Sequence, residues 1–380
     1  MATSALVGAR VFDGERFLPE HAVVLQAGLV DTVCRVDQLA SGIERLDLGG
    51  GVLAPGFIDI QVNGGGGVLL NNAPTTGGLQ TLVDAHRAGG TTACMPTIIT
   101  DAERIQKQAL EAFEQADAAG VAGLLGIHFE GPYLSTRRRG VHSDTFIREA
   151  SPADLDWLCE AAAGCRILLT VAPEAMRPGQ IARLTEAGVL VFCGHTAASF
   201  EQTMSAVSEG AAGFTHLFNA MSPLGSREPG VVGAALLADD TYCGIICDGH
   251  HVHADVIRLA HRAKPRGKLL LVSDAMATVG ATTKSFELYG ETISESGGRL
   301  VNGEGRLAGS AISMLDAVRY THLECGIALD ECLRMASRYP AELLGVSGER
   351  GYLRPAYRAD LVHFDETLSA ARTWVSGKPS

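Results

Sequence analysis

The sequence predicts an α/β fold: a (β/α)8 TIM-like barrel joined to a small β-sandwich domain that the N- and C-terminal segments form together. Three observations indicate it, namely eight short apolar runs, helix-like segments between most of them, and β-rich patterns at both ends of the 380-residue chain. Runs that are apolar throughout are typical of parallel strands covered on both faces, and their number matches the barrel. A doubly wound open sheet is the structural alternative, which a count of eight disfavours.

The barrel elements follow one another in chain order. The expected strands are Gly56–Val62, Thr91–Thr97, Leu124–Glu130, Arg166–Ala172, Val189–Gly194, Gly213–Leu217, Tyr242–Asp248 and Lys268–Asp274. Helices are expected where amphipathic stretches carry capping residues or terminal glycines. These stretches are Leu79–Ala88, Asp101–Ala119 with Asp101 as N-cap, a helix starting at Ser151 and Pro152, Pro178–Ala187, Ser199–Glu209, Ala311–Cys325 and Asp330–Leu344.

The two ends of the chain have a different pattern from the middle. Short strand-like segments, Ala5–Phe12 and His21–Leu25, lie in the first 50 residues, and strands return at Ala359–Phe364 and Ala371–Val375. A barrel bracketed by β-rich ends predicts that the ends meet in one domain. We therefore expect residues 1–52 and 346–380 to form the small β domain and residues 53–345 to form the barrel.

Composition and charge exclude several classes of protein. With 46% hydrophobic residues the chain is expected to fold rather than to remain disordered. The formal net charge of −12 lacks the basic footprint of a nucleic-acid-binding protein. No apolar run approaches the roughly 18 residues of a membrane-spanning helix, and the N-terminus does not resemble a signal peptide. The nine cysteines form no CxxC pair, which favours a reducing compartment and a cytoplasmic location.

Titratable residues stand where several of the apolar runs stop. Glu130, His195, His216 and Asp274 each end or directly follow such a run. Any one of them alone is more often structural, but in a barrel the strand ends converge on one mouth. Two imidazoles and one carboxylate form the ligand set of a catalytic metal site, suited to Zn²⁺, Fe²⁺, Co²⁺ or Mn²⁺. Asp274 is then the candidate general base for a metal-assisted hydrolysis.

Four further features keep two interpretations open. The glycine run Gly64–Gly67 either lets the backbone approach a ligand or forms a flexible turn. His142 is either an exposed loop residue or part of the site. His251 and Arg227 are either surface residues or groups that bind an anion, arginine being especially suited to phosphate.

Six segments of the chain together resemble the N-acetylglucosamine-6-phosphate deacetylases of the amidohydrolase superfamily. The likeness runs from about residue 5 to 377. The matching segments are residues 54–64 (APGFIDIQVNG), 128–134 (HFEGPYL), 194–196 (GHT), 215–221 (THLFNAM), 248–252 (DGHHV) and 272–275 (VSDA).

This resemblance implies a role for each matching residue. It implies metal binding by Glu130, His195 and His216, proton transfer by Asp274 as base and then acid, and polarisation of the acetyl carbonyl by His142. It also implies a homodimer in which Arg227 reaches the phosphate across the interface. The implied substrate contacts are Val141, His142, Asn219, Ala220, Arg227, His251, Leu307, Ala308 and Gly309.

The chain differs from many amidohydrolases at one point that affects the expected number of metal ions. Many amidohydrolases bind two metals through H-x-H after the first strand, and here those positions are Gln61 and Asn63. We therefore expect one divalent metal ion per subunit, with zinc first and iron, cobalt or manganese as alternatives.

The implied reaction is hydrolysis of the acetamide of N-acetylglucosamine 6-phosphate to glucosamine 6-phosphate and acetate, in amino-sugar catabolism and cell-wall recycling. The partner is then a phosphorylated amino sugar, with no nucleic acid and no membrane. One alternative is a deacetylase of another such sugar, for example N-acetylgalactosamine 6-phosphate. A second is a non-catalytic amidohydrolase-like assembly protein, against which the intact metal set and base argue.

Overall fold

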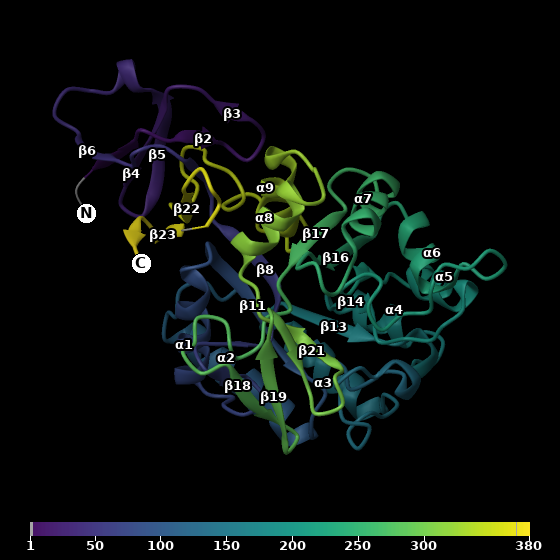
Figure 1. Ribbon diagram of the computed structural model, residues 1–380. Helices are drawn as coiled ribbons and strands as arrows, with labels where there is room; N and C mark the ends of the chain where they lie inside the picture. The colour runs from purple at the N-terminus through teal and green to yellow at the C-terminus, as the bar shows by residue number, and fades with distance from the viewer. Residues whose placement is uncertain (1–2, 370) are drawn as a thin grey trace.

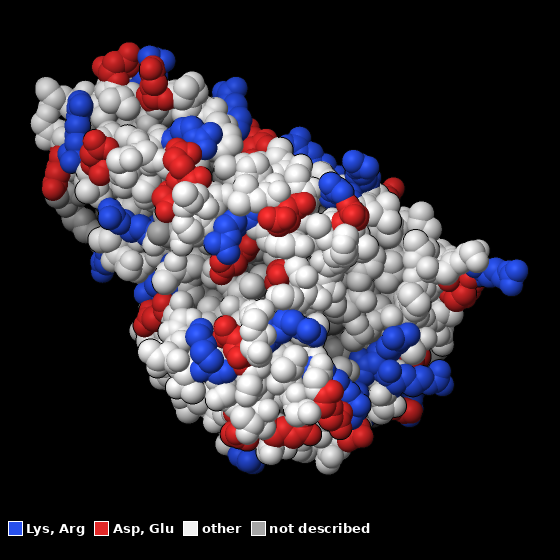
Figure 2. Space-filling model, in the orientation of Figure 1, with Lys and Arg blue, Asp and Glu red and all other residues white. Residues whose placement is uncertain are grey.

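The computed structural model describes residues 3–369 and 371–380, so Met1, Ala2 and Ala370 of the expected terminal segments lie outside the description. Figure 1 shows a large body of strands wrapped by helices, with a smaller β-rich body at one corner where both termini lie. Acidic and basic side chains are interspersed over the face shown in Figure 2, so the net negative charge is not gathered into one acidic surface there. Within the described residues, no helix is long and apolar enough to cross a membrane.

The large body is a (β/α)8 barrel, which confirms the predicted fold class. Its eight strands pair in parallel and in sequence order, and each coincides with an expected apolar run. The first and last strands close the barrel through a parallel bridge between Val62 and Ala275, beside which the Asp274 amide donates to the Gln61 carbonyl at 3.0 Å. The strands are β8 (Phe57–Val62), β11 (Thr91–Ile99), β12 (Ile127–Glu130), β13 (Ile167–Val171), β14 (Leu190–Cys193), β15 (Gly213–Phe214), β16 (Tyr242–Ile246) and β17 (Leu269–Val272).

A helix follows each barrel strand and covers its outer face. These eight helices are α1 (Thr76–Arg87), α2 (Glu103–Ala118), α3 (Pro152–Ala162), α4 (Gln180–Glu186), α5 (Phe200–Ser208), α6 (Gly230–Leu237), α7 (Ala254–Ala263) and α8 (Met314–Leu323). Two more, α9 (Leu329–Ala336) and α10 (Arg338–Leu343), follow α8. Ser151 and Ser199 cap α3 and α5 in capping boxes.

Two helix predictions were wrong. Asp101 does not cap α2, which begins after Ala102 without a side-chain cap, because the Asp101 carboxylate accepts from Asn71 Nδ2 at 2.8 Å. The expected helix over residues 330–344 is two helices, α9 and α10, which meet at Ser337. Pro340 explains the break, since it has no N–H to donate to a carbonyl one turn earlier.

The terminal segments meet in two small sheets, as predicted. A six-stranded sheet in the order β24-β23-β22-β7-β2-β3 joins strands from both ends of the chain, and a four-stranded sheet in the order β5-β4-β1-β6 comes from the N-terminal part. Leu6, Val23 and Trp374 belong to the buried cluster that both sheets share. The strands are β1 (Ser4–Val7), β2 (Arg10–Phe12), β3 (Phe17–Leu18), β4 (His21–Gln26), β5 (Leu29–Arg35), β6 (Glu44–Asp47), β7 (Val52–Pro55), β22 (Leu361–Phe364), β23 (Ala371–Val375) and β24 (Lys378–Pro379).

A third small sheet, which the sequence analysis did not predict, lies between β17 and α8. This inserted sheet is antiparallel and consists of β18 (Ser285–Leu288), β19 (Glu291–Ser296), β20 (Arg299–Val301) and β21 (Leu307–Ser310), and it is seen at the lower edge of Figure 1. Its buried Leu288, Ile293 and Leu300 pack with Ile99 and Met276, which follow or end barrel strands. The inserted sheet therefore covers part of the mouth where the barrel strands end.

The glycine run after β8 is a tight hairpin. β9 (Gly64–Gly65) pairs with β10 (Val68–Leu69), and the two residues between them, Gly66 and Gly67, have positive φ. The structure thus favours the turn interpretation of this run.

Candidate active site

Three predicted metal ligands converge at the carboxyl end of the barrel. Glu130 ends β12, while His195 and His216 each stand two residues beyond a strand, β14 and β15. Glu130 Oε1 lies 3.1 Å from His195 Nε2 and 2.9 Å from His216 Nε2. All three side chains are buried, and their ligand atoms lie within 4.8 Å of one another.

The donor chemistry of this cluster fits a divalent metal. His195 Nδ1 lies 2.9 Å from the Arg138 carbonyl, so Nδ1 carries the proton and the Nε2 lone pair faces Glu130 and His216. The two Nε2 atoms are only 3.0 Å apart, an arrangement that a shared cation satisfies and two lone pairs do not. A carbonyl that fixes the imidazole in this way is the usual outer partner of a metal-binding histidine.

The backbone is strained at the residues that form the site. His195 (φ 47°), His216 (φ 32°) and Asp274 (φ 52°) all have left-handed conformations, which cost on the order of 1–3 kcal/mol for residues other than glycine. Each stands two residues beyond the end of a barrel strand, β14, β15 or β17. Such conformations persist only where the surrounding structure determines them, and they cluster at functional sites.

Asp274 is held beside the metal cluster by two amide side chains. Its Oδ1 accepts from Asn63 Nδ2 at 2.7 Å and from Gln61 Nε2 at 3.1 Å. The same Gln61 amide donates to Glu130 Oε1 at 3.1 Å. Burial, and next the negative charge of Glu130, raise the pKa of Asp274 to about 6. The sequence analysis noted Gln61 and Asn63 only because they replace the two histidines of the H-x-H motif. In the structure their side-chain amides orient the candidate base.

Glu130 remains ionised in this buried cluster. Burial alone would raise the pKa of Glu130, but the neighbouring imidazoles of His195 and His216 hold it well below its usual value. The cluster therefore offers one negative carboxylate and two imidazole nitrogens to a cation.

A cavity of about 170 Å³ opens over these residues. Glu130, His195, His216 and Asp274 line it. Most of the predicted substrate contacts line it as well, namely Val141, His142, Asn219, Ala220, His251, Leu307 and Gly309. His142 Nδ1 lies 2.9 Å from Thr100 Oγ1, and its ring centroid is 4.3 Å from that of His195. Burial, reinforced by His195, holds the pKa of His142 well below its usual value, so this imidazole is neutral.

His251 is oriented by a neighbouring carboxylate. Its Nδ1 lies 2.6 Å from Asp248 Oδ2. Although burial opposes ionisation of Asp248, the hydrogen bond with His251 lowers the pKa of that carboxyl to about 2. The imidazole is thus fixed at the cavity wall, where it belongs to the lining.

Two predicted contacts do not reach the cavity of this chain. Arg227 is exposed on the loop before α6, which projects from the molecule at the right of Figure 1. Ala308 is fully buried in the core of the inserted sheet, because alternate residues of β21 face opposite sides and only Leu307 and Gly309 face the cavity.

Sequence reasoning missed several lining residues because it considered mainly residues with polar or charged side chains. Ile99 and Ile246 end β11 and β16, and Met276 lies shortly after β17. Their position at strand ends was itself a usable signal. They give the cavity an apolar wall that titratable residues alone did not indicate.

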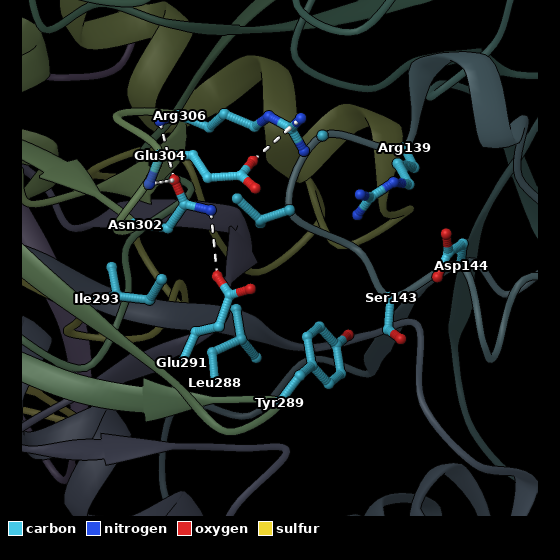
Figure 3. Close-up of a pocket in the computed structure, with 12 residues that line it drawn as sticks. Arg139, Ser143, Asp144, Leu288, Tyr289, Glu291, Ile293, Asn302, Glu304 and Arg306 are labelled. Atoms are coloured by element: carbon cyan, nitrogen blue, oxygen red, sulfur yellow. Dashed lines mark hydrogen bonds and ion pairs between the residues drawn. The ribbon is translucent and has the colours of Figure 1, made fainter.

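A second cavity, of about 200 Å³, lies beside the first between the loop over residues 139–144 and the inserted sheet. Figure 3 shows two pairs of its polar side chains directed toward each other, Asn302 with Glu291 and Arg306 with Glu304. Asn302 Nδ2 donates to Glu291 Oε2 at 3.2 Å, and Arg306 pairs with Glu304 at 3.1 Å. Because these groups satisfy one another, they do not indicate a ligand.

Known protein families match nearly the whole chain. Residues 52–380 match the amidohydrolase family and residues 4–53 match the NagA composite domain. The N-acetylgalactosamine-6-phosphate deacetylase of Shewanella sp. (strain ANA-3) is 41% identical over 86% of this chain and 83% of its own length. The N-acetylglucosamine-6-phosphate deacetylase of Haemophilus influenzae is 34% identical over 98% of both chains.

Solved structures agree with these relatives. The crystal structure of N-acetylglucosamine-6-phosphate deacetylase from Pasteurella multocida is 35% identical, with a TM-score of 0.96 over 100% of this chain and 99% of that one. A mutant of the Mycobacterium smegmatis enzyme in complex with N-acetyl-D-glucosamine-6-phosphate is 30% identical, with a TM-score of 0.92 and the same coverage.

Proposed function

The chain belongs to the amidohydrolase family, and from that premise we propose that it hydrolyses the acetamide of N-acetylglucosamine 6-phosphate to glucosamine 6-phosphate and acetate. The observation that carries the proposal is the buried cluster of Glu130, His195 and His216 beside Asp274 in one cavity. An assembly protein would need neither a metal cluster nor a base.

The proposal gives each polar residue one task. A divalent metal held by Glu130, His195 and His216 would polarise the acetyl carbonyl and acidify a bound water. Asp274 takes the proton of the attacking water and returns it to the leaving nitrogen, for which a pKa near 6 is well suited. Because Gln61 and Asn63 occupy Oδ1, we assign this proton transfer to Oδ2.

His142 is proposed to donate a hydrogen bond to the acetyl oxygen. It can do so from Nε2 only if Nδ1 accepts a hydrogen bond from the Thr100 hydroxyl, 2.9 Å away. In the other tautomer Thr100 donates to the Glu130 carbonyl, 3.1 Å away, and Nε2 has no proton to offer. The reaction therefore selects the first tautomer.

The phosphate is proposed to bind His251 and an Arg227 supplied by a second subunit. A dianion entering a protein with a net charge of −12 needs local cations, and in a single chain Arg227 stands outside the cavity on a projecting loop. A homodimer would bring that loop to a neighbouring site.

All nine cysteines are free, which supports the proposed cytoplasmic location.

The substrate test is acetate release from N-acetylglucosamine 6-phosphate, N-acetylgalactosamine 6-phosphate and the two unphosphorylated sugars. We expect the first to be preferred and both unphosphorylated sugars to be poor. The 41% identity to the Shewanella enzyme favours the galactosamine epimer as the second candidate. Preference for that epimer would replace the proposed substrate, and no acetate from any of the four would overturn the activity.

The metal test is elemental analysis of the purified protein and of two ligand variants. We expect about one divalent metal per subunit, zinc being the proposed one, and loss of most of it in His195→Ala and His216→Ala. His261→Ala is the matched control, because this histidine lies on α7 and outside the cavity. Two tightly bound metals per subunit, or unchanged content in both ligand variants, would contradict the assignment.

The phosphate test compares Arg227→Ala on phosphorylated and unphosphorylated substrate. We expect kcat/KM to fall roughly tenfold to a hundredfold on the phosphorylated sugar only, as for a lost charge-assisted hydrogen bond of about 1.5–3 kcal/mol. Mixing Arg227→Ala with Asp274→Asn subunits should restore activity, since one site of the mixed dimer keeps both groups. Equal losses on both substrates would make Arg227 structural, and no rescue despite demonstrated subunit exchange would place it in its own subunit's site.

A further inference from the structure

The backbone of the candidate base is hydrogen-bonded on both edges. On one edge, the Asp274 amide donates to the Gln61 carbonyl at 3.0 Å and the Asn63 amide donates to the Ala275 carbonyl at 2.9 Å. On the other, the Ser310 amide donates to the Asp274 carbonyl at 2.9 Å, and the Ser310 carbonyl accepts from the Met276 amide at 3.0 Å. Residues 274–276 thus link the end of β8 to the end of β21, with Ala275 forming parallel bridges to Val62 on one side and to Ser310 on the other.

Ser310 adds a side-chain bond to this arrangement. Its Oγ donates to the Ser273 carbonyl at 2.5 Å, and the residue is only 1% exposed. The preceding Gly309 has a φ of 63°, and a Cβ added there would lie 2.8 Å from the Asp274 carbonyl oxygen. The end of β21 is therefore pressed against the backbone of the base with no room for a side chain between them.

This contact matters because the conformation of Asp274 is not self-sustaining. A φ of 52° is uncommon for a residue other than glycine, and such a conformation persists where the surrounding structure determines it. The barrel supplies one edge through β8 and the inserted sheet supplies the other through β21. If the second edge is loosened, the carboxylate can turn away from the amides of Gln61 and Asn63 that orient it.

We propose that Ser310 is a positioning residue for Asp274, and that the inserted sheet acts on catalysis through it. Ser310 touches Ser273, Asp274 and Met276 but does not line the cavity. The test by kcat rests on the proposed function, because it needs the substrate. The test by amide hydrogen exchange depends only on the backbone hydrogen bonds.

The kinetic experiment compares Ser310→Ala with Ser337→Ala. Ser337 is an equally buried serine whose Oγ also donates to a backbone carbonyl, that of Leu333 at 2.6 Å, between α9 and α10. Both variants lose one hydroxyl and should lose similar stability. We expect only Ser310→Ala to lower kcat, by about tenfold, with KM and metal content unchanged, and Ser310→Thr to recover part of the loss.

The structural experiment is amide hydrogen exchange of the peptide that contains residues 273–276 in the same variants. We expect faster exchange there in Ser310→Ala and wild-type exchange in Ser337→Ala. Unchanged exchange in Ser310→Ala would overturn the proposal even if the enzyme acted on a different substrate. A kcat loss that is equal in both serine variants would also overturn it, because the effect would then follow stability alone.

Discussion

The barrel carries two kinds of additional β-sheet, and only one of them reaches the catalytic mouth. The terminal sheets join residues from both ends of the chain, β7 pairing with β22 across some 300 residues of sequence, and they contribute nothing to the lining of the site cavity. The inserted sheet is made of local hairpins, yet it supplies Leu307 and Gly309 to that cavity and braces Asp274.

The difference extends to how buried charge is used. In the terminal region Asp360 is buried against Arg350 and Arg358 and accepts from the Ser376 amide at 2.7 Å, an arrangement that joins the tail to the rest of the domain. Asp274 instead accepts from neutral amides, which leave its charge available for proton transfer. The ion pairs of Asp360 hold parts of the terminal region together, whereas the amides of Gln61 and Asn63 orient a carboxylate that lines the cavity.

The comparison is tested most strongly by Asp274→Asn. Removing the base should lower kcat by about 10²–10⁴-fold, while the metal stays bound and thermal stability stays near that of the wild type. Steady-state kinetics, metal analysis and a melting curve measure the three quantities. A variant with nearly wild-type kcat would mean that another group moves the proton.

The opposite pattern is expected of Asp360→Asn in the terminal region. Breaking a buried ion pair by removing one partner typically costs about 3–5 kcal/mol, so denaturant unfolding should begin at a much lower concentration. At 25 °C the folded fraction should keep the wild-type kcat. If kcat fell as far as in Asp274→Asn, the terminal domain would take part in catalysis and the comparison would fail.

The smallest effect separates packing of the inserted sheet from its contact with the base. Ile293→Val removes one methylene from the buried cluster of this sheet and should cost about 0.5–1.5 kcal/mol. Since the end of β21 is untouched, kcat should not change. Chemical denaturation and steady-state kinetics on the same preparation measure the loss of stability and kcat. A fall in kcat parallel to the loss of stability would show that the overall stability of the inserted sheet, rather than Ser310, determines the position of Asp274.

Much of the barrel was predictable because its strands are buried on both faces and hence apolar throughout. The inserted sheet was not, since β19 buries a single residue, Ile293, fully and so carries almost no apolar signal. Its hairpin glycines, Gly290 and the pair Gly297 and Gly298, were the available signal. The misassigned cap at Asp101 has a similar cause, because the competing partner Asn71 is distant in sequence.

The sequence by itself determined the order of the barrel strands and the residues at their ends, because parallel strands in a closed barrel all finish at one mouth. Strand order alone is therefore enough to bring Glu130, His195 and His216 near one another. Tertiary structure alone decided what surrounds them: the amides of Gln61 and Asn63 on Asp274, the brace from Ser310, and the exclusion of Arg227 from its own chain's cavity. Each of these depends on side-chain direction and on contacts between residues far apart in the chain, which periodicity and composition do not encode.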